Sequence, residues 1–361
     1  MDLKHDVGAI AQRFQIYGAF VSTEPYGTGH INDTYCVVFD QAGSRVRYIF
    51  QRINHLVFKN PVGLMDNVSR VTRHLGGKFA GARDQSRRAL TLIPARDGKP
   101  FHHDENGLYW RVYLFIERAQ TYDAVQSPAQ AFEAAQAFGR FQSLLADLPA
   151  PRLHDTIADF HHTPKRFLAL EHAIAADAVN RAAHAKPEIA FALRHQGMRS
   201  VLLEANLPER VTHNDTKFNN VMLDDATGAG ICVIDLDTVM PGLALYDFGD
   251  MVRTTTSPVP EDERDLAKVT MQFPMFEALV RGYLTSASEF LTSAEKQHLA
   301  FAAKLITFEI GIRFLTDFLA GDTYFKIHRE GHNLDRCRTQ FKLVESIEQQ
   351  ETQMNRLVEE I

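Results

Sequence analysis

The sequence predicts an α+β protein in which a small, β-rich N-terminal part precedes a larger, mainly helical C-terminal part. The chain has 361 residues, a length that favours two structural units, and 45% of them are hydrophobic, which is enough for sizeable cores. Runs of β-branched and aromatic residues gather before about residue 118, whereas apolar residues after it recur mostly at helical spacing.

The N-terminal part carries the strongest strand signals. The runs TYCVVFD and VRYIFQRI are separated by QAGS, which predicts a hairpin over residues 34–53. A third strand is predicted at YWRVYLFIE, residues 109–117. Between them, PVGLMDNVSRVTRHLGG predicts a helix over residues 61–77, and a polar pair of strands follows with DENG as its turn.

The C-terminal part begins with a helix predicted over residues 127–148. Ser127 stands directly before Pro128, which is a typical helix start. The apolar residues at helical spacing are Phe132, Ala135, Phe138, Phe141 and Leu145. We therefore divide the chain into two domains, residues 1–118 and 119–361. Short strand-like runs in RVTHND, NVMLD and GICVIDLD interrupt the helices of the second domain.

Composition excludes several classes of function. The chain has 39 Lys and Arg against 45 Asp and Glu, a net charge of −6, so we expect a small-molecule partner and no nucleic acid. The N-terminal residues MDLKHDVGAIAQRF lack the apolar stretch of a signal peptide, and no run approaches a membrane span. We expect no membrane partner and a cytoplasmic location. Cys36, Cys232 and Cys337 are far apart and are expected to be buried thiols.

The stretch VTHNDTKFNNVMLDD carries the clearest chemical pattern. It places His213, Asp215 and Asn220 in the order H-x-D-x-x-x-x-N, and Asp235 follows at the end of the next strand-like run. Kinase-type phosphotransferases use this order, with an Asp that accepts the proton of the acceptor hydroxyl and an Asn and Asp that hold Mg²⁺ on ATP. A lone Asp after a strand is more often a turn or cap residue, but the ordered set with its flanking strands favours phosphoryl transfer.

The segments THNDTKFNN, VIDLDTVMPG and LYDFGD resemble the aminoglycoside phosphotransferase and choline kinase superfamily. The segments YGTGHINDTY, YIFQRIN, FIE and RLHDTIADFHHTPKRF are most similar to the N-acetylhexosamine 1-kinases within it. This resemblance covers most of the chain. It implies a protein-kinase-like bilobal fold, with a small N-terminal lobe that clamps ATP over a larger helical lobe.

The resemblance also implies roles for the motif residues. Asp215 would be the catalytic base, Asn220 and Asp235 the metal ligands, Asp247 a structural acid that steadies the catalytic loop, and His213 a scaffold residue. Asp237, two residues after Asp235, is a candidate contact for a second metal ion.

The nucleotide-binding residues follow the family pattern less closely. Gly27 and Gly29 lie where the phosphate-covering loop belongs, but they fall short of G-x-G-x-x-G. Gln51 and Arg52 stand where the third strand should present a Lys to the phosphates. Because adjacent strand residues face opposite sides, only one can point inward; spacing favours Gln51 and charge favours Arg52. Glu117 lies in FIERAQ, which resembles the hinge that pairs with adenine.

The candidate acceptor residues are Arg313, Arg253 and Thr254. Arg313 and Asp317 are four residues apart on an apolar helix, so they form either an intrahelical ion pair or leave Arg313 free to reach acceptor oxygens from the cleft. Arg253 and Thr254 follow LYDFGD closely, and Thr254 replaces the aromatic residue of related kinases.

The histidines His102, His103, His161 and His162 occur in polar loop sequence without other ligands at a matching spacing. We expect them to be solvated loop residues.

The sequence thus predicts an ATP-dependent kinase that phosphorylates the anomeric hydroxyl of an N-acetylhexosamine, GlcNAc or GalNAc, with Mg²⁺. Two alternatives stay open. One is a choline, homoserine, methylthioribose or aminoglycoside kinase with the same motifs. The other is a nucleotide-binding regulator without turnover.

Overall fold

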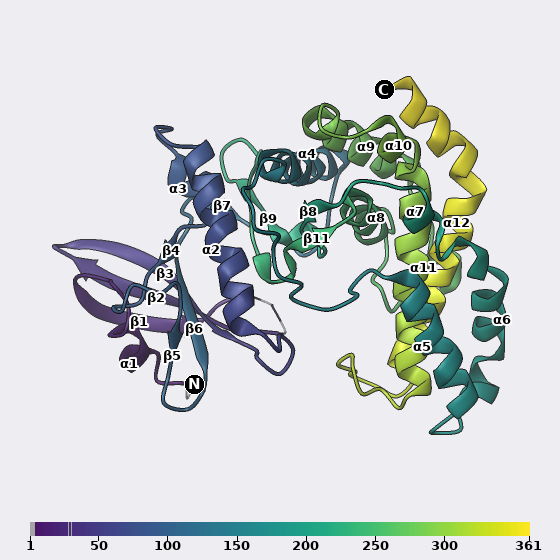
Figure 1. Cartoon of the computed structure of the whole chain (residues 1–361), viewed down its shortest axis with the longest axis horizontal. Helices are drawn as coiled ribbons and strands as arrows, with labels where there is room; N and C mark the ends of the chain where they lie inside the picture. The colour runs from purple at the N-terminus through teal and green to yellow at the C-terminus, as the bar shows by residue number, and fades with distance from the viewer. Residues whose placement is uncertain (1–3, 28, 30) are drawn as a thin grey trace.

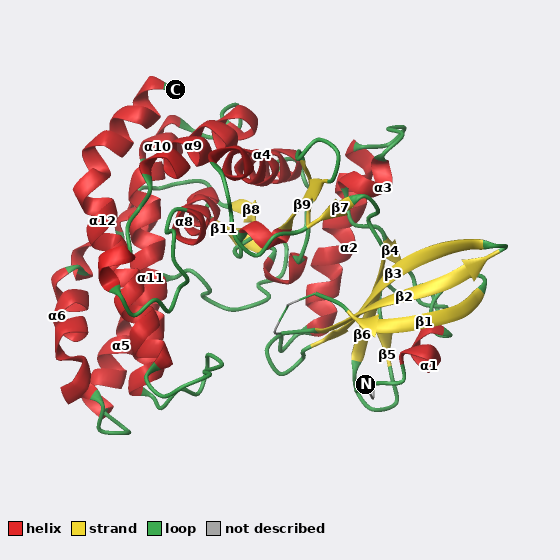
Figure 2. Ribbon diagram, turned by 180° about the vertical axis from the view of Figure 1, so that it is seen from behind, coloured by secondary structure: helices red, strands yellow, loops and turns green. Residues whose placement is uncertain are grey.

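A computed structural model of the chain describes residues 4–27, 29 and 31–361. An antiparallel sheet lies at one end of the molecule and a helical body at the other (Figure 1, Figure 2). The predicted α+β class is therefore confirmed. The domain division between residues 118 and 119 stays a prediction.

Six strands of the N-terminal part form one sheet in the order β1-β2-β3-β6-β4, with β5 paired to β6. Its elements are α1 (Val7–Ala11), β1 (Ala19–Pro25), β2 (Asp33–Gln41), β3 (Ser44–Ile53), α2 (Pro61–Lys78), α3 (Gln85–Arg88), β4 (Leu92–Ile93), β5 (His102–His103) and β6 (Tyr109–Leu114). The hairpin, the third strand and the helix over residues 61–77 predicted from the sequence are all present.

The two faces of this sheet pack against different parts of the protein, and the strand register determines on which face each residue lies. Tyr48 and Phe50 of β3 and Trp110 of β6 share a buried cluster with α1. The alternate residues face the other way: Gln51 of β3 lies opposite Arg111 of β6, and Arg111 approaches Met65 of α2. The second face therefore points towards α2 and the rest of the molecule.

The C-terminal part is built from helices around two small sheets. Its helices are α4 (Pro128–Leu145), α5 (Thr163–Ala176), α6 (Lys186–Arg194), α7 (Val201–Glu204), α8 (Ala244–Thr255), α9 (Phe273–Ala287), α10 (Ser293–Gln297), α11 (Leu299–Leu319) and α12 (His332–Glu360), with 3₁₀ turns η1 (Ala182–Ala185), η2 (Gln196–Met198), η3 (Phe218–Asn220), η4 (Leu236–Thr238) and η5 (Leu266–Lys268). Its strands are β7 (Ala119–Gln120), β8 (Arg210–Thr212), β9 (Val221–Asp224), β10 (Gly230–Val233) and β11 (Met240–Gly242).

Helix α4 confirms the predicted helix start, because the Ser127 hydroxyl accepts a hydrogen bond from the Gln130 amide at 3.3 Å. Its predicted apolar stripe packs closely against α9. A Cβ on Gly282 would lie 2.2 Å from the Phe132 carbonyl oxygen, and one on Gly139 would lie 2.7 Å from the Tyr283 carbonyl oxygen. Glycine at both positions lets the backbones of α4 and α9 approach closely.

Two short sheets hold the predicted motif in place. In one, β9 lies between β10 and β7, and in the other β8 pairs with β11. The segments 213–220 and 234–239 connect these strands, so both halves of the motif leave the sheets side by side. Strand β11 has no counterpart in the sequence prediction.

All three cysteines are free and buried, as predicted. In the described residues, no helix is both long and apolar enough to cross a lipid bilayer.

Candidate active site

The segment after β8 is held by Asp247, a fully buried carboxylate of α8. Its two oxygens accept hydrogen bonds from the backbone amides of His213, at 2.8 Å, and Asn214, at 2.7 Å. The Gln142 amide of α4 donates a third bond at 2.6 Å. Burial raises the pKa of Asp247, although these donors favour its charged form. The catalytic-loop backbone is thus fixed to two helices at once.

His213 is buried beneath the same loop. Its Nδ1 accepts a hydrogen bond from the Asp215 amide at 3.3 Å, and its Nε2 donates to the Ile234 carbonyl oxygen at 2.9 Å. The rings of Phe138 and Phe141 pack edge-on against it. Both ring nitrogens of His213 form hydrogen bonds with backbone atoms. His213 therefore joins residue 215 to the segment that carries Asp235, as expected of a scaffold residue.

Asp215 remains reachable from solvent, with 27% of its side chain exposed, and forms an ion pair with Lys217 at 2.8 Å. Burial opposes the charge of Asp215, but the Lys217 ammonium outweighs this effect and lowers the pKa of Asp215. Asp215 is therefore an ionised acceptor at neutral pH. Its placement suits the proton-accepting position that the sequence predicts.

Asn220 and Asp235 lie beside Asp215. The Asn220 Nδ2 donates to the backbone oxygen of Asp215 at 2.8 Å and to its Oδ2 at 3.2 Å, which leaves the amide oxygen of Asn220 for another ligand. The Ile234 amide donates to the Asn220 backbone oxygen at 2.9 Å. Asp235 follows in the left-handed region, with φ of 58°.

The donor set fits a hard divalent cation. Asp235 is an exposed residue with many protein atoms around its carboxylate, and this partial desolvation, together with the nearby carboxylates of Asp237 and Asp215, raises the pKa of Asp235 to about 6. A carboxylate that lies among other carboxylates and forms no ion pair in the described residues, with an amide oxygen at its side, is a donor set that suits Mg²⁺. Asn220 and Asp235 are the residues that would hold the ion.

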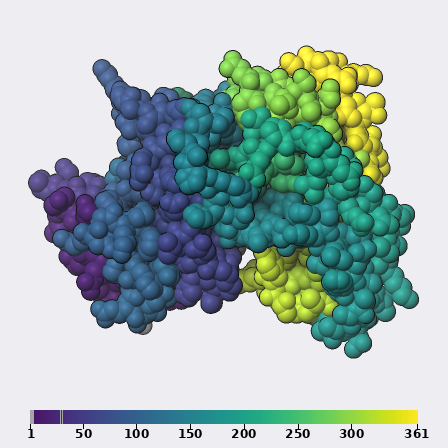
Figure 3. Space-filling view, viewed as in Figure 1, coloured from purple at the N-terminus to yellow at the C-terminus, as the bar shows by residue number. Residues whose placement is uncertain are grey.

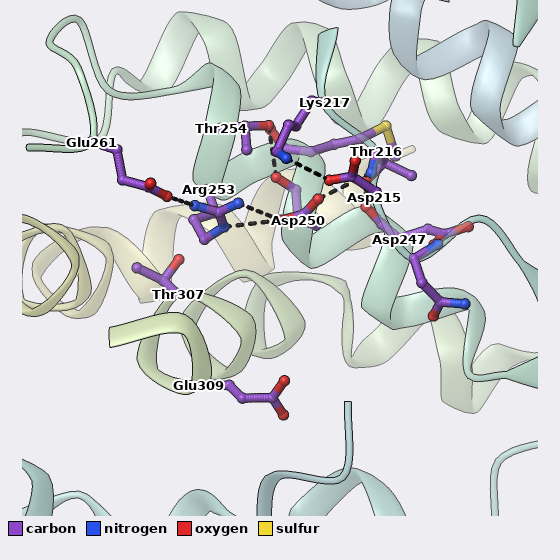
Figure 4. A network of polar contacts seen from close by, with 12 residues as sticks. Asp215, Thr216, Lys217, Asp247, Asp250, Arg253, Thr254, Glu261, Thr307 and Glu309 are labelled. Atoms are coloured by element: carbon purple, nitrogen blue, oxygen red, sulfur yellow. Dashed lines mark hydrogen bonds and ion pairs between the residues drawn. The ribbon is translucent and has the colours of Figure 1, made fainter. Parts of the chain in front are cut away.

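Arg253 and Thr254 lie behind the loop on α8, in the network of Figure 4. Asp250 accepts a hydrogen bond from the Thr216 amide at 3.0 Å and pairs with Arg253 at 2.8 Å. Arg253 also pairs with Glu261 at 2.6 Å, and only 7% of its surface is exposed. The hydroxyl of Thr254 donates to the Asp250 backbone oxygen at 2.8 Å. The polar groups of both predicted acceptor residues are thus engaged within the protein.

On the nucleotide side, register separates the two candidates for the phosphate contact. Gln51 lies on the sheet face directed towards α2 and accepts a hydrogen bond from Arg111 Nε at 2.9 Å. Arg52 lies on the face covered by α1, where it pairs with Asp33 at 2.6 Å. Gln51 therefore faces α2, whereas Arg52 faces α1. A nucleotide contact stays a prediction for both residues, and the orientation favours Gln51.

The remaining nucleotide candidates are Gly27, Gly29 and Glu117. Gly27 has φ of 78°, and a Cβ added to Gly27 or Gly29 would meet no atom within 4 Å, so there is open space beside these two glycines. Glu117 pairs with Arg47, whose guanidinium lies 3.8 Å from the Phe115 ring centre. The Glu117 side chain is held in place, and the backbone that follows β6 leads directly into the C-terminal part.

On the opposite side, Arg313 of α11 lies between aromatic rings. Its guanidinium is 5.0 Å from the Phe160 ring centre and 5.8 Å from that of Phe325. Asp317 is directed elsewhere: it accepts hydrogen bonds from the amides of Thr323, Tyr324 and Phe325 at 2.8–2.9 Å. The alternative of an intrahelical Arg313–Asp317 ion pair is thus wrong. Asp317 instead shapes the loop after α11, which borders the notch between the two parts of the molecule (Figure 3).

The prediction that His102, His103, His161 and His162 are solvated loop residues is wrong: His102 and His103 form strand β5, His162 caps α5, and His161 departs furthest from the prediction. It is buried, and its Nδ1 lies 2.8 Å from Glu309 of α11, while its Nε2 lies 3.4 Å from the Asn214 backbone oxygen. Burial opposes the charge of Glu309, but His161 and Arg313 outweigh it and lower the pKa of Glu309. His161 therefore connects the catalytic loop to the helix that carries Arg313.

Comparison with known proteins decides the family. A family model described as phosphotransferase enzyme family matches residues 22–273. The chain belongs to this family. Among solved structures, this phosphotransferase is similar to an aminoglycoside phosphotransferase from Alicyclobacillus acidocaldarius, with a TM-score of 0.62, 11% identity, and 100% and 98% of the two chains covered.

The phosphotransferase is also similar to a microcompartment-associated aminopropanol kinase, with a TM-score of 0.60, 17% identity, and 96% and 98% coverage. A spectinomycin phosphotransferase, solved with ADP and spectinomycin, matches with a TM-score of 0.58, 12% identity, and 92% and 94% coverage. Sequence identities this low show a similar fold and nothing further. The kinase-like bilobal fold predicted from the sequence is confirmed.

The sequence prediction missed Lys217, Arg111 and Glu309. For Lys217 a signal was available, because a cation two residues after the motif Asp can reach that carboxylate. Arg111 and Glu309 gave no such signal: each is charged within an otherwise apolar element, and their partners Asp237 and His161 are more than a hundred residues away in the chain.

Asp247→Ala should destabilise the phosphotransferase strongly. It leaves two backbone amides and the Gln142 side chain without an acceptor in a buried site, at a cost of about 3 kcal/mol or more. Urea unfolding measures the change. Thr254→Val, which removes one half-buried hydroxyl on the same helix, is the matched control and should cost about 1 kcal/mol or less. Equal stability of the two variants would contradict the central role of Asp247.

Proposed function

We propose that this phosphotransferase is an ATP-dependent kinase that transfers the γ-phosphoryl group to the anomeric hydroxyl of an N-acetylhexosamine, GlcNAc or GalNAc. The observation that carries the kinase proposal is the grouping of Asp215, Asn220 and Asp235 on one rigid loop pair. Family membership supports the same chemistry.

We infer a role in phosphoryl transfer for each residue of the site. Asp215, ionised beside Lys217, orients the acceptor hydroxyl and takes its proton as the oxygen attacks phosphorus. The bond from phosphorus to the bridging oxygen breaks, and ADP leaves with that oxygen. When bound, Mg²⁺ would neutralise the charge of the phosphates. Lys217, half-exposed at the same place, adds a positive charge from the protein.

The acceptor side supports an uncharged acceptor. Arg313 is 91% buried by surface area, since 9% is exposed, and among the described residues it forms no hydrogen bond or ion pair. The pKa of Arg166 is lowered, chiefly by the burial of Arg166 itself and next by the positive charge of Arg313. The Arg313 guanidinium, beside the rings of Phe160 and Phe325, repels an ammonium group but can donate to sugar oxygens.

This arrangement counts against choline and aminoglycosides as acceptors, because they are cations that a guanidinium repels. Methylthioribose stays as an alternative because it carries no ammonium group, and homoserine stays because a guanidinium can bind its carboxylate. A regulator without turnover is disfavoured, since Asp215 is ionised and solvent-accessible and the metal-binding set is intact.

Asp215→Asn should abolish most turnover while ATP binding persists. The substitution removes the proton acceptor but keeps its shape, and kcat is expected to fall about 100-fold or more. An ADP-release assay measures kcat, and calorimetry measures nucleotide affinity. Retention of the parent kcat with intact ATP binding would remove Asp215 from the mechanism.

Arg313→Met should raise the acceptor KM about 10-fold or more, because a charge-assisted hydrogen bond to the acceptor is lost, while the KM for ATP changes little. Arg181→Met is the matched control: Arg181 also stacks on an aromatic ring, Phe318, at 4.8 Å, but it is paired with Asp322. We expect it to leave both KM values near the parent's. An acceptor KM that does not respond to Arg313→Met refutes the acceptor role.

The nature of the product tests the acceptor proposal. With Mg·ATP and a panel of sugars, amines and amino alcohols, GlcNAc or GalNAc should give a higher kcat/KM than glucose, since a pocket built for the amide leaves polar groups unpaired with a plain hexose. The product should lack reducing activity because phosphate blocks ring opening. A reducing product places the phosphate elsewhere, and rapid turnover of an amine alone assigns the enzyme to the choline or homoserine group.

A further inference from the structure

The turn directly after the metal ligand Asp235 is the place where the N-terminal lobe meets the catalytic machinery. Three elements of that lobe converge on residues 237–239. Arg111 of β6 and Asn32, which lies before β2, both bind the Asp237 carboxylate, Asn32 at 2.6 Å. Asn67 of α2 donates to the Val239 backbone oxygen at 3.0 Å.

The Arg111–Asp237 pair is among the most deeply buried in the described part of the chain. The two side chains are 1% and 3% exposed. Both oxygens of Asp237 are occupied, one by Arg111 and the other by Asn32. A carboxylate whose lone pairs point to the other lobe is not available to a second metal ion, so this arrangement counts against the metal role that the sequence suggested for Asp237.

Each partner is itself fixed within the N-terminal lobe. Arg111 donates to Gln51 at 2.9 Å, and Gln51 donates to Thr34 of β2 at 3.1 Å. The Asn32 side-chain oxygen accepts the Asn54 amide at 2.9 Å. The contacts with Asp237 therefore link strands β2, β3 and β6, and Asn32 before β2, to residues 235–239.

The same group of residues lies where the lysine of the third strand is expected. Kinase-type enzymes place a Lys there, but here Gln51 and Arg52 stand at the position, and Arg111 on the neighbouring strand is the cation next to Gln51. Gln51 acts as the hydrogen-bond partner that orients it.

We propose that Arg111 and Asp237 are a positioning pair that sets strands β2 and β6 of the N-terminal lobe against residues 235–239, so that ATP is held in register with Asp215. This inference rests on the proposed kinase function. Asp237 acts through Arg111 and Asn32, and it is not a second metal ligand.

Arg111→Met and Asp237→Asn test the pair. Misplacement of a reacting group by about 1 Å can cost 100-fold in rate, so we expect each variant to lower kcat about 10-fold or more and to raise the KM for ATP, with the acceptor KM changing less. Excess Mg²⁺ should restore neither. Amide hydrogen exchange should become faster in residues 31–34 and 236–240 of both variants.

Arg338→Met is the control for loss of a helix-joining ion pair, because Arg338 binds Glu188 at 2.6 Å between α12 and α6, outside the site. It should lower the melting temperature and leave kcat and the KM for ATP unchanged. If a single variant fails to fold, the double variant Arg111→Met/Asp237→Leu removes both buried charges together, which is tolerated far better than removing one, and it should show the same kinetic loss.

Two results overturn the proposal. One is a folded double variant with the parent's kcat, KM for ATP and hydrogen exchange. The other is an Asp237→Asn variant restored by excess Mg²⁺ while Arg111→Met keeps the parent's rate, which assigns Asp237 to the metal. Failure of the kinase proposal is distinct, since the parent protein then turns over no acceptor, whereas the exchange experiment still reports on the pair.

Discussion

The buried carboxylate of Asp247 is the interaction on which the active-site geometry depends. Its bonds to the amides of His213 and Asn214 fix the backbone just before Asp215, and the bond from Gln142 ties the same carboxylate to α4. Without an acceptor these buried amides would oppose this loop conformation by several kcal/mol in total. The close packing of α4 against α9, made possible by Gly139 and Gly282, keeps that acceptor in position.

Local sequence signals predicted the parts of the fold that local physics decides. The β2–β3 hairpin follows from two alternating runs around a turn, and α4 follows from its apolar stripe and the Ser127 cap. The spacing of Asp215 and Asn220 predicted their proximity, and the two side chains do touch. Strand β11 was missed because its three residues pair with β8, which lies about thirty residues earlier in the chain, and a stretch this short carries no periodicity of its own.

The rest of the site depends on pairings between residues that are distant in the chain. Sequence could not choose between Gln51 and Arg52, because only the register against β6 shows which of them faces Arg111 and which faces Asp33. Arg313 was ambiguous for a similar reason. Its helical neighbour Asp317 accepts hydrogen bonds from the backbone amides of residues 323–325. The sequence of that loop has no pattern that predicts its conformation.

The distribution of charge connects these observations to function. Asp215, Asp235 and Asp237 lie close together, and three neighbouring carboxylates repel one another when their charges are unmatched. Lys217 compensates Asp215 and Arg111 compensates Asp237, so Asp235 is left as the carboxylate in need of a cation. Arg313 is the reverse case, a buried cation that forms no ion pair among the described residues, although its charge lowers the pKa of Glu309. In the function that we propose, the anionic position at Asp235 takes the metal-bound nucleotide, and the cationic position at Arg313 takes an oxygen-rich, uncharged acceptor.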